Sequence, residues 1–304
     1  MASATPTLHL PNSSRGRLFI LPREHGSWGM LLVPLITGAV AGYPRGERII
    51  WILIFAVAAL GLFCLRTPVE AGMEISALRP QNDAERKLIH YSIYLYTSVA
   101  VSSLAVLMLW ARAYGLLLLG AAAAITFLLQ AVLKQLGREP RLRAEAPASS
   151  DSPQPLRRAE ARMTAHLTGA IALSSTAAGA YYLATGHFGP TAAIIWLANW
   201  LFAANQIHFV QLRIHSARAM TRGEKLHQGW GFLLHQAACL LLLGLIWRAG
   251  WLPGLILMAF APLFVRGFEW FLESPRPLQV HRLGVNEMLY AIVFAMFFIA
   301  GFHH

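Results

Sequence analysis

Apolar blocks long enough to cross a membrane recur along the whole sequence. Nine such blocks are separated by polar segments. The length of each block is close to the about 17–25 residues that a helix needs to cross roughly 30 Å of hydrocarbon. Only 13% of the residues are charged, compared with about 25% in soluble domains. A soluble core cannot enclose so much apolar surface. The sequence therefore predicts an all-α, polytopic membrane protein.

The expected transmembrane helices follow these blocks. They are Trp28–Tyr43, Ile49–Leu65, Ile89–Trp110, Ala113–Leu133, Met163–Thr185, Ala192–Gln211, Trp230–Trp247, Trp251–Val265 and Asn286–Phe302. Residues 1–21 lack an apolar stretch before Phe19, which predicts a polar cytoplasmic tail and no signal peptide. Residues 137–162 are rich in Pro, Ala, Ser and Arg, which predicts a flexible basic linker. It would join helices 1–4 (residues 22–136) to helices 5–9 (residues 163–304).

Basic residues are distributed unevenly between the two ends of the expected helices. With a cytoplasmic N-terminus, all but four of the 25 Lys and Arg residues lie in cytoplasmic segments, the exceptions being Arg45, Arg48, Arg112 and Arg248. Positive residues near helix ends are retained in the cytoplasm, so we expect the N-terminus inside and the C-terminus outside. The basic residues would then lie beside anionic lipid. Membrane lipids, and no nucleic acid, are the expected partners.

Polar residues gather at the cytoplasmic ends of the first two expected helices. Arg23, Glu24 and His25 precede the first helix, where they could bind a ligand or anchor the helix at the interface. Near the end of the second helix, Glu70 and Glu74 have the i,i+4 spacing that puts two carboxylates on one helix face. Such a pair could share Mg²⁺ with a diphosphate, or it could form ion pairs with Arg66, Arg79 or Arg86.

The sixth expected helix has a polar stripe. Asn205, His208, Gln211 and His215 recur at helical spacing in an otherwise apolar segment. Polar groups at membrane depth are costly unless they face the bundle interior or a wet cavity, so the stripe predicts a binding surface. Arg213 and Arg218 continue this region, and their guanidinium groups suit an anionic head group.

Further polar residues lie in the last three expected helices. His235 lies inside the seventh helix, where it could line a cavity or ligate haem with His90 or His208, although no paired spacing within a helix supports haem. We expect Arg266 in the last cytoplasmic loop and Glu287 within about a turn of the interface. Cys64 and Cys239 form no C-x-x-C pair, so neither a disulfide nor a structural metal site is expected.

Several of these segments resemble a known family. The run Pro22-Arg23-Glu24-His25-Gly26-Ser27-Trp28, followed by Leu31-Leu32-Val33-Pro34 and Gly38, resembles the opening signature of the YwiC-like bacterial membrane proteins. Phe63-Cys64-Leu65-Arg66-x-Pro68 resembles a second block of that family, and Arg213 with Arg218 a third. The resemblance implies a bacterial inner-membrane location. It implies no particular activity.

A more distant resemblance is to the UbiA superfamily of intramembrane prenyltransferases. That superfamily also has nine helices, and Asp-rich motifs in the loops after helices two and six hold magnesium and a prenyl diphosphate. Here the first of these loops has Glu70, Glu74, Asp83 and Glu85 without an N-D-x-x-D pattern, and the second, Arg213 to Gly229, has Glu224 as its only acid. The resemblance implies a UbiA-like helical bundle. If the protein is an enzyme, it implies a prenyltransferase-like transferase that lacks the usual motifs.

Three kinds of function remain open from the sequence. The first is a cytoplasm-facing cavity that binds or transfers an isoprenoid or another anionic lipid, with Arg66, Arg213 and Arg218 at the head group. The second is a transporter of a small polar or anionic solute, with the stripe around His208 lining its path. The third is a subunit that holds b-type haem or a quinone near His235. None of them requires a soluble partner, and the oligomeric state is left open.

Overall fold

The computed structural model describes residues 25–43, 46, 48–73, 82–136, 154–216, 221–273 and 278–303. All regular elements in these ranges are α-helices: α1 (His25–Ala41), α2 (Arg48–Gly72), α3 (Asp83–Leu109), α4 (Gly115–Leu136), α5 (Gln154–Thr185), α6 (Pro190–His215), α7 (Arg222–Arg248), α8 (Gly254–Leu272) and α9 (Val280–His303). Seven of them are long and apolar enough to cross a membrane. The chain is therefore an all-helical, multi-pass membrane protein, as its apolar blocks predict.

The two helices outside these seven form the centre of the bundle. α1 is a shorter apolar helix. α5 is rich in Ala, Gly, Ser and Thr, and it packs against α1, α2, α4 and α6. Ala177, Ala178 and Ala180 of α5 are completely buried. Small residues let neighbouring backbones approach closely, and a helix enclosed by protein does not need the hydrophobicity of a lipid-facing one.

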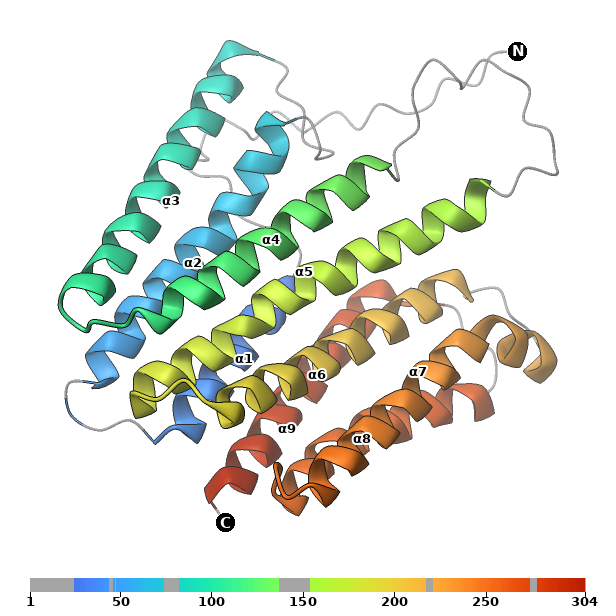
Figure 1. Cartoon of the computed structure of the whole chain (residues 1–304). Helices are drawn as coiled ribbons and strands as arrows, with labels where there is room; N and C mark the ends of the chain where they lie inside the picture. Colours follow the sequence, from blue (N-terminus) through green and yellow to red (C-terminus); the bar gives the residue numbers. More distant parts are fainter. Residues whose placement is uncertain are drawn as a thin grey trace.

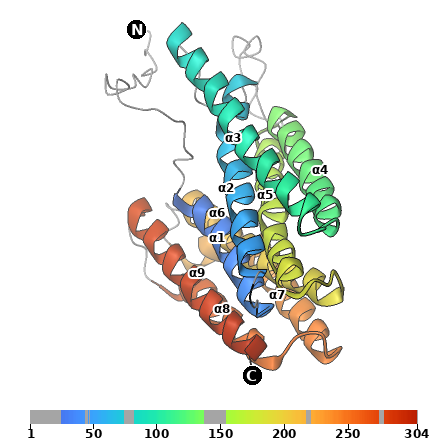
Figure 2. The same ribbon diagram turned by 90° about the vertical axis from the view of Figure 1, so that its left-hand side faces the viewer.

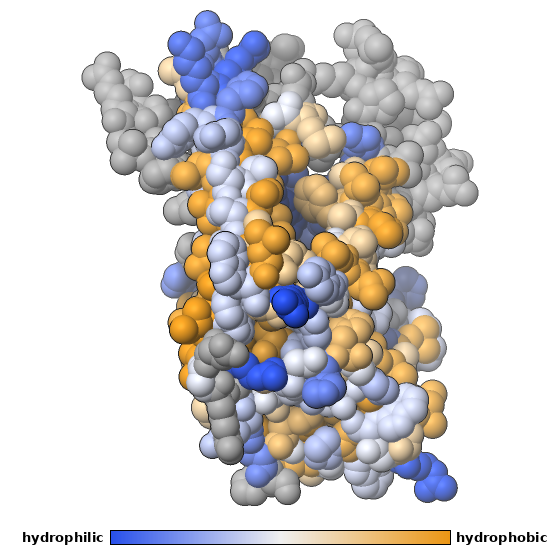
Figure 3. All heavy atoms as spheres, turned by 60° about the vertical axis from the view of Figure 1, so that its left-hand side comes forward, coloured by the Kyte–Doolittle hydropathy of each residue, from blue (hydrophilic) through white to orange (hydrophobic). Residues whose placement is uncertain are grey.

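The remaining helices lie on either side of this centre. In Figures 1 and 2, α2, α3 and α4 lie on one side of α1 and α5, and α6 to α9 lie on the other. The largest core cluster is on the second side, where Phe202 and Phe294 stack with ring centroids 4.0 Å apart. Apolar side chains cover much of the face seen in Figure 3, while hydrophilic ones gather at its top, where α3 begins, and in smaller patches lower down. This distribution suits a surface that lies mostly in hydrocarbon.

Successive helices alternate in direction, so α1, α3, α5, α7 and α9 all begin at the same end of the bundle (Figure 1). We call this end the basic end, because the Lys and Arg residues expected in the cytoplasm belong to its segments. Because α1 and α9 begin at the same end, the described part of the bundle has an odd number of helices in alternating directions, which agrees with the nine expected spans. Its cytoplasmic orientation remains a prediction.

Most helices extend beyond the expected spans, and the differences at α5, α8 and α9 bear on the linker and the site. α5 begins at Gln154, inside the expected linker 137–162, where Ala159, Glu160 and Ala161 are good helix formers. α8 continues past Val265 to Leu272, and α9 begins at Val280. Arg266 and Glu287 therefore lie inside helices. The expectation that Arg266 lies in a loop was wrong, because its charge pairs with Glu287 and α8 can continue in the protein interior. Glu287 lies in α9, as expected, and its distance from the membrane interface stays a prediction.

Candidate ligand site

A cavity of about 290 Å³ opens among α1, α2, α4, α5, α6 and α9 toward the basic end. Much of its wall is apolar, including Met30, Leu173 and Met288. Its polar residues come from all six helices and are Ser27, Arg66, Gln130, His166, Gln206, Gln211 and Glu287. We call this space the first cavity. Its lining is amphipathic, which is typical of sites that bind a polar group attached to an apolar chain.

Arg66 holds its place in the first cavity through Glu70. Arg66 Nε donates to Glu70 Oε1 at 3.0 Å, and Lys134 Nζ of α4 donates to the same oxygen at 2.7 Å. Glu70 is thus the ion-pair partner of two cations. The sequence left two roles open for this carboxylate, a Mg²⁺ ligand and an ion-pair partner, and the structure has the second. Within the described ranges, no three His, Cys, Asp or Glu side chains are grouped so that they could hold a metal ion.

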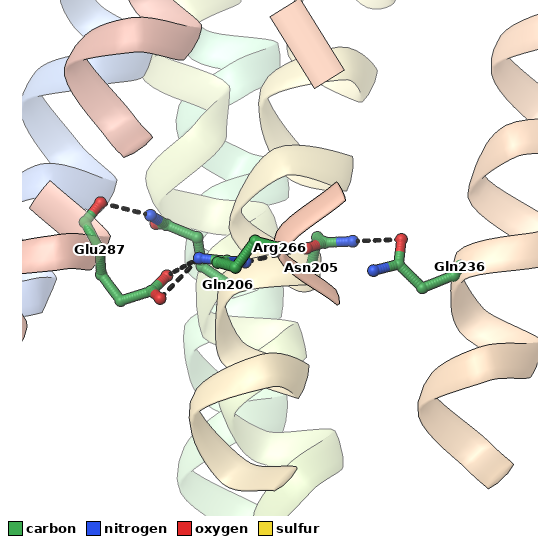
Figure 4. A network of polar contacts seen from close by, with 5 residues as sticks. All are labelled: Asn205, Gln206, Gln236, Arg266 and Glu287. Carbon is green, nitrogen blue, oxygen red and sulfur yellow. Dashed lines mark hydrogen bonds and ion pairs between the residues drawn. The ribbon is translucent and has the colours of Figure 1, made fainter. Parts of the chain in front are cut away.

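A buried polar network joins four helices beside the first cavity (Figure 4). Arg266 of α8 forms a salt bridge with Glu287 of α9, and its Nη2 donates to Asn205 Oδ1 of α6 at 3.2 Å. Asn205 Nδ2 in turn donates to Gln236 Oε1 of α7 at 2.9 Å. Gln206 Nε2 donates to the backbone carbonyl of Glu287 at 2.8 Å. All five side chains are buried, so the network fixes α7, α8 and α9 to α6.

Aromatic rings enclose the cation of this network. The Arg266 guanidinium carbon lies 4.1 Å from the ring centroid of Phe209 and 4.7 Å from that of Tyr290. Only 6% of Arg266 is exposed to solvent. A guanidinium is weakly hydrated and can stack on aromatic faces, which makes it the cation best suited to such a place. Its removal from water still requires the Glu287 carboxylate beside it.

The two histidines that the sequence singles out meet between α6 and α7. The rings of His208 and His235 lie 4.4 Å apart between centroids, and His235 Nε2 lies 3.5 Å from Cys239 Sγ. Two histidines that ligate one haem have the iron and the porphyrin plane between them, whereas these two rings are in direct contact. The pair does not fit a bis-histidine haem site. His90, the other suggested partner, is exposed on α3.

A second cavity of about 300 Å³ lies among the ends of α6 and α8 and the beginning of α9. Its charged residues are Arg213, Arg266, Arg282, Glu269, Glu273 and Glu287. It shares Leu283 and Glu287 with the first cavity. Glu287 therefore stands between an amphipathic space and a strongly polar one.

The structure separates the residues that the sequence predicts as one ligand site. Arg66 and Gln211 line the first cavity, Arg213 lines the second, and Asn205 belongs to the network beside both. His208 and His235 line neither cavity. Glu70 pairs with Arg66 behind the first cavity. Four predicted residues lie outside the described residues, namely Arg23, Glu24, Glu74 and Arg218, and of His25 only the backbone is described.

The site also contains residues that the sequence interpretation missed. Gln130, His166 and Gln206 line the first cavity. Gln130 and Gln206 each lie inside an apolar helix and are buried, the same signal that pointed to Asn205. That rule, applied to every polar residue inside an apolar span, would have found them. Arg266 and Glu287 were placed at helix ends, where charged residues need no explanation.

Comparison with known proteins gives one match. The family model described as YwiC-like protein matches residues 21–149, which include α1 to α4. No curated protein matches the chain, and no solved structure matches it. The matched segment supplies Arg66, Glu70, Gln130 and Lys134, one wall of the first cavity and the ion pairs behind it.

Proposed function

We propose that this chain, whose residues 21–149 match the model of the YwiC-like family, binds the anionic head group of a membrane amphiphile in its first cavity. The observation that carries the proposal is the Arg66 guanidinium on the wall of a largely apolar cavity. A guanidinium binds phosphate or carboxylate oxygens in a bidentate way. Gln130 and Gln211 can donate further hydrogen bonds to such a group.

The size and position of the first cavity support an amphiphile more than a free anion. Its volume of about 290 Å³ is at the lower end of the range of roughly 300–1,000 Å³ for small-molecule sites. It suits a head group with its first few carbons. Apolar residues such as Leu173, Ile207 and Met288 make up much of the rest of the wall, and they would contact the start of a hydrocarbon chain.

Binding to Arg66 can be tested with farnesyl diphosphate as the anionic probe and farnesol as its neutral counterpart. In detergent, Arg66→Gln is expected to weaken farnesyl diphosphate binding by about tenfold or more, because a charge-assisted bidentate contact is lost. Farnesol binding should change little. Glu70 keeps Lys134 as a partner in this variant, so the fold should persist. Arg86→Gln, at an exposed site on α3, removes the same charge away from the cavity and is the control.

A steric variant tests the cavity itself. Gly29 lines the first cavity, and a Cβ at this position would have no atom within 4 Å. Gly29→Leu is expected to fill the space and to remove both farnesyl diphosphate and farnesol binding. Gly120→Leu, at a similarly open site on α4, is the matched control. Unchanged binding in both Arg66→Gln and Gly29→Leu would show that the probe binds elsewhere.

A transporter of a small polar or anionic solute is the second candidate. The observation that favours it is the contact between the two cavities at Glu287, beside a buried ion pair that could change partners. It predicts solute flux in proteoliposomes that Glu287→Gln reduces. Vesicles that stay sealed to a broad solute panel would leave head-group binding as the better account.

We also propose that the basic end faces the cytoplasm of a bacterial inner membrane, in a bundle built like those of the UbiA superfamily. In a variant without Cys64 and Cys239, a cysteine at Trp251 should react with a membrane-impermeant maleimide in intact cells. A cysteine at Thr221 should react only after lysis, because α7 begins at the basic end and α8 begins at the opposite end. The reverse labelling pattern would invert the proposed topology.

A further inference from the structure

We propose that the second cavity binds a small zwitterion, a molecule that carries an ammonium group and a carboxylate or phosphate. This site is separate from the amphiphile site in the first cavity. Its walls carry three guanidinium groups and three carboxylates, and the amides of Gln279 and Asn286 add hydrogen-bond donors and acceptors. Charges of both signs around one cavity can pair with a ligand that carries both signs.

Two of the six charges already satisfy each other. Arg266 and Glu287 form the buried salt bridge at the inner wall, where Phe209 and Tyr290 cover the guanidinium. This pair closes the cavity toward the bundle interior. It leaves Arg213 and Arg282 as cations and Glu269 and Glu273 as carboxylates in the outer part.

These four outer charges form no salt bridge with one another within the described residues. Arg213 is half-buried near the end of α6, and the other three are exposed around the opening. Lys225 lies beside the cavity but is not part of its lining, and its Nζ donates to the backbone carbonyls of Trp270 and Glu273 at 2.8 and 2.7 Å. The outer cavity therefore offers two positive and two negative groups to a ligand.

The balance of charge selects the chemical class of the ligand. A simple anion would be attracted to Arg213 and Arg282 but repelled by Glu269 and Glu273, and a simple cation would meet the opposite conflict. A like charge beside the ligand opposes its binding. A zwitterion pairs each sign with its complement. Such a ligand is either a free amino acid or the phosphoethanolamine head group of a membrane lipid, and the two share the same ammonium and anionic groups.

Isothermal titration with purified full-length protein tests the class. The zwitterionic probes are glycine and glycerophosphoethanolamine, and the singly charged probes are glycerol phosphate and ethanolamine. At least one zwitterion should bind about tenfold or more tightly than either singly charged probe. Binding of glycine alone would identify a free amino acid as the source. Binding of glycerophosphoethanolamine alone, with retention of ethanolamine lipid in native mass spectrometry, would identify a head group.

Two charge variants provide a readout that misfolding would not produce. Arg213→Gln should weaken zwitterion binding by about tenfold and shift the preference toward ethanolamine, whereas Glu269→Gln should shift it toward glycerol phosphate. Arg222→Gln, at an exposed position at the start of α7, is the control. The proposal is overturned if neither zwitterion binds better than its singly charged parts, or if both variants change binding less than about twofold.

The failure of this site and that of the first cavity can be distinguished. Gly29→Leu fills the first cavity and should leave zwitterion binding unchanged. Arg213→Gln should leave farnesyl diphosphate binding unchanged, because Arg213 lines only the second of the two cavities.

Discussion

Replacing Glu287 with alanine is expected to cost about 3–5 kcal/mol of folding free energy, because it leaves the Arg266 charge buried without its partner. Arg266 is only 6% exposed, and its remaining side-chain contacts are Asn205 and two aromatic rings. Neither an amide oxygen nor a ring can replace a carboxylate. Unfolding can be followed with a thiol-reactive dye, since Cys64 and Cys239 are buried and become reactive only when the bundle opens.

A paired substitution distinguishes the loss of stability that comes from an unpaired charge from the loss that comes from an unfilled volume. Arg266→Met with Glu287→Met should recover most of the loss, because apolar residues of similar length remove both charges and keep the volume. Glu269→Ala removes a carboxylate from the exposed side of α8 and should change stability by no more than about 0.5 kcal/mol. If the double variant were as unstable as Glu287→Ala, the loss would come from packing and not from an unpaired charge.

This ion pair marks the limit of what the sequence could predict. Apolar length was enough to predict a helical bundle, because a membrane-spanning backbone must satisfy its own hydrogen bonds. A charge near the end of an apolar block looks like the end of a helix. Arg266 of α8 and Glu287 of α9 lie inside their helices, where each pairs with the other. That pairing depends on how two helices pack, and one sequence does not contain it.

The division of the expected ligand site has a simpler geometric cause. Gln211 and Arg213 are two residues apart on α6, and neighbours at this spacing point to different faces of a helix. Gln211 lines the first cavity and Arg213 the second. The sequence interpretation grouped them because both lie at one helix end. Helical spacing could have separated them, but it could not have shown that a cavity lies on each side.

Gly38→Ala is expected to destabilise the bundle by about 3 kcal/mol, the upper part of the range for overpacking. α1 and α5 cross so closely that a Cβ on Gly38 would lie 2.0 Å from the carbonyl oxygen of Ala177 and 2.7 Å from its Cα. Both contacts are with backbone, which cannot rotate away, so the helices must separate. Gly120→Ala, where a Cβ meets nothing within 4 Å, should cause no loss.

The neighbouring glycine gives this prediction its sharpest control. Gly42 lies one turn later, directly after the end of α1, and a Cβ there would meet a side chain of α5, at 2.4 Å from Ala184 Cβ. Ala184→Gly should therefore restore the stability lost in Gly42→Ala. Ala177→Gly should not rescue Gly38→Ala, because the obstructing atoms remain in the backbone. Rescue at both positions in the same dye assay would mean that α1 and α5 lie farther apart at Gly38 than the structure has them.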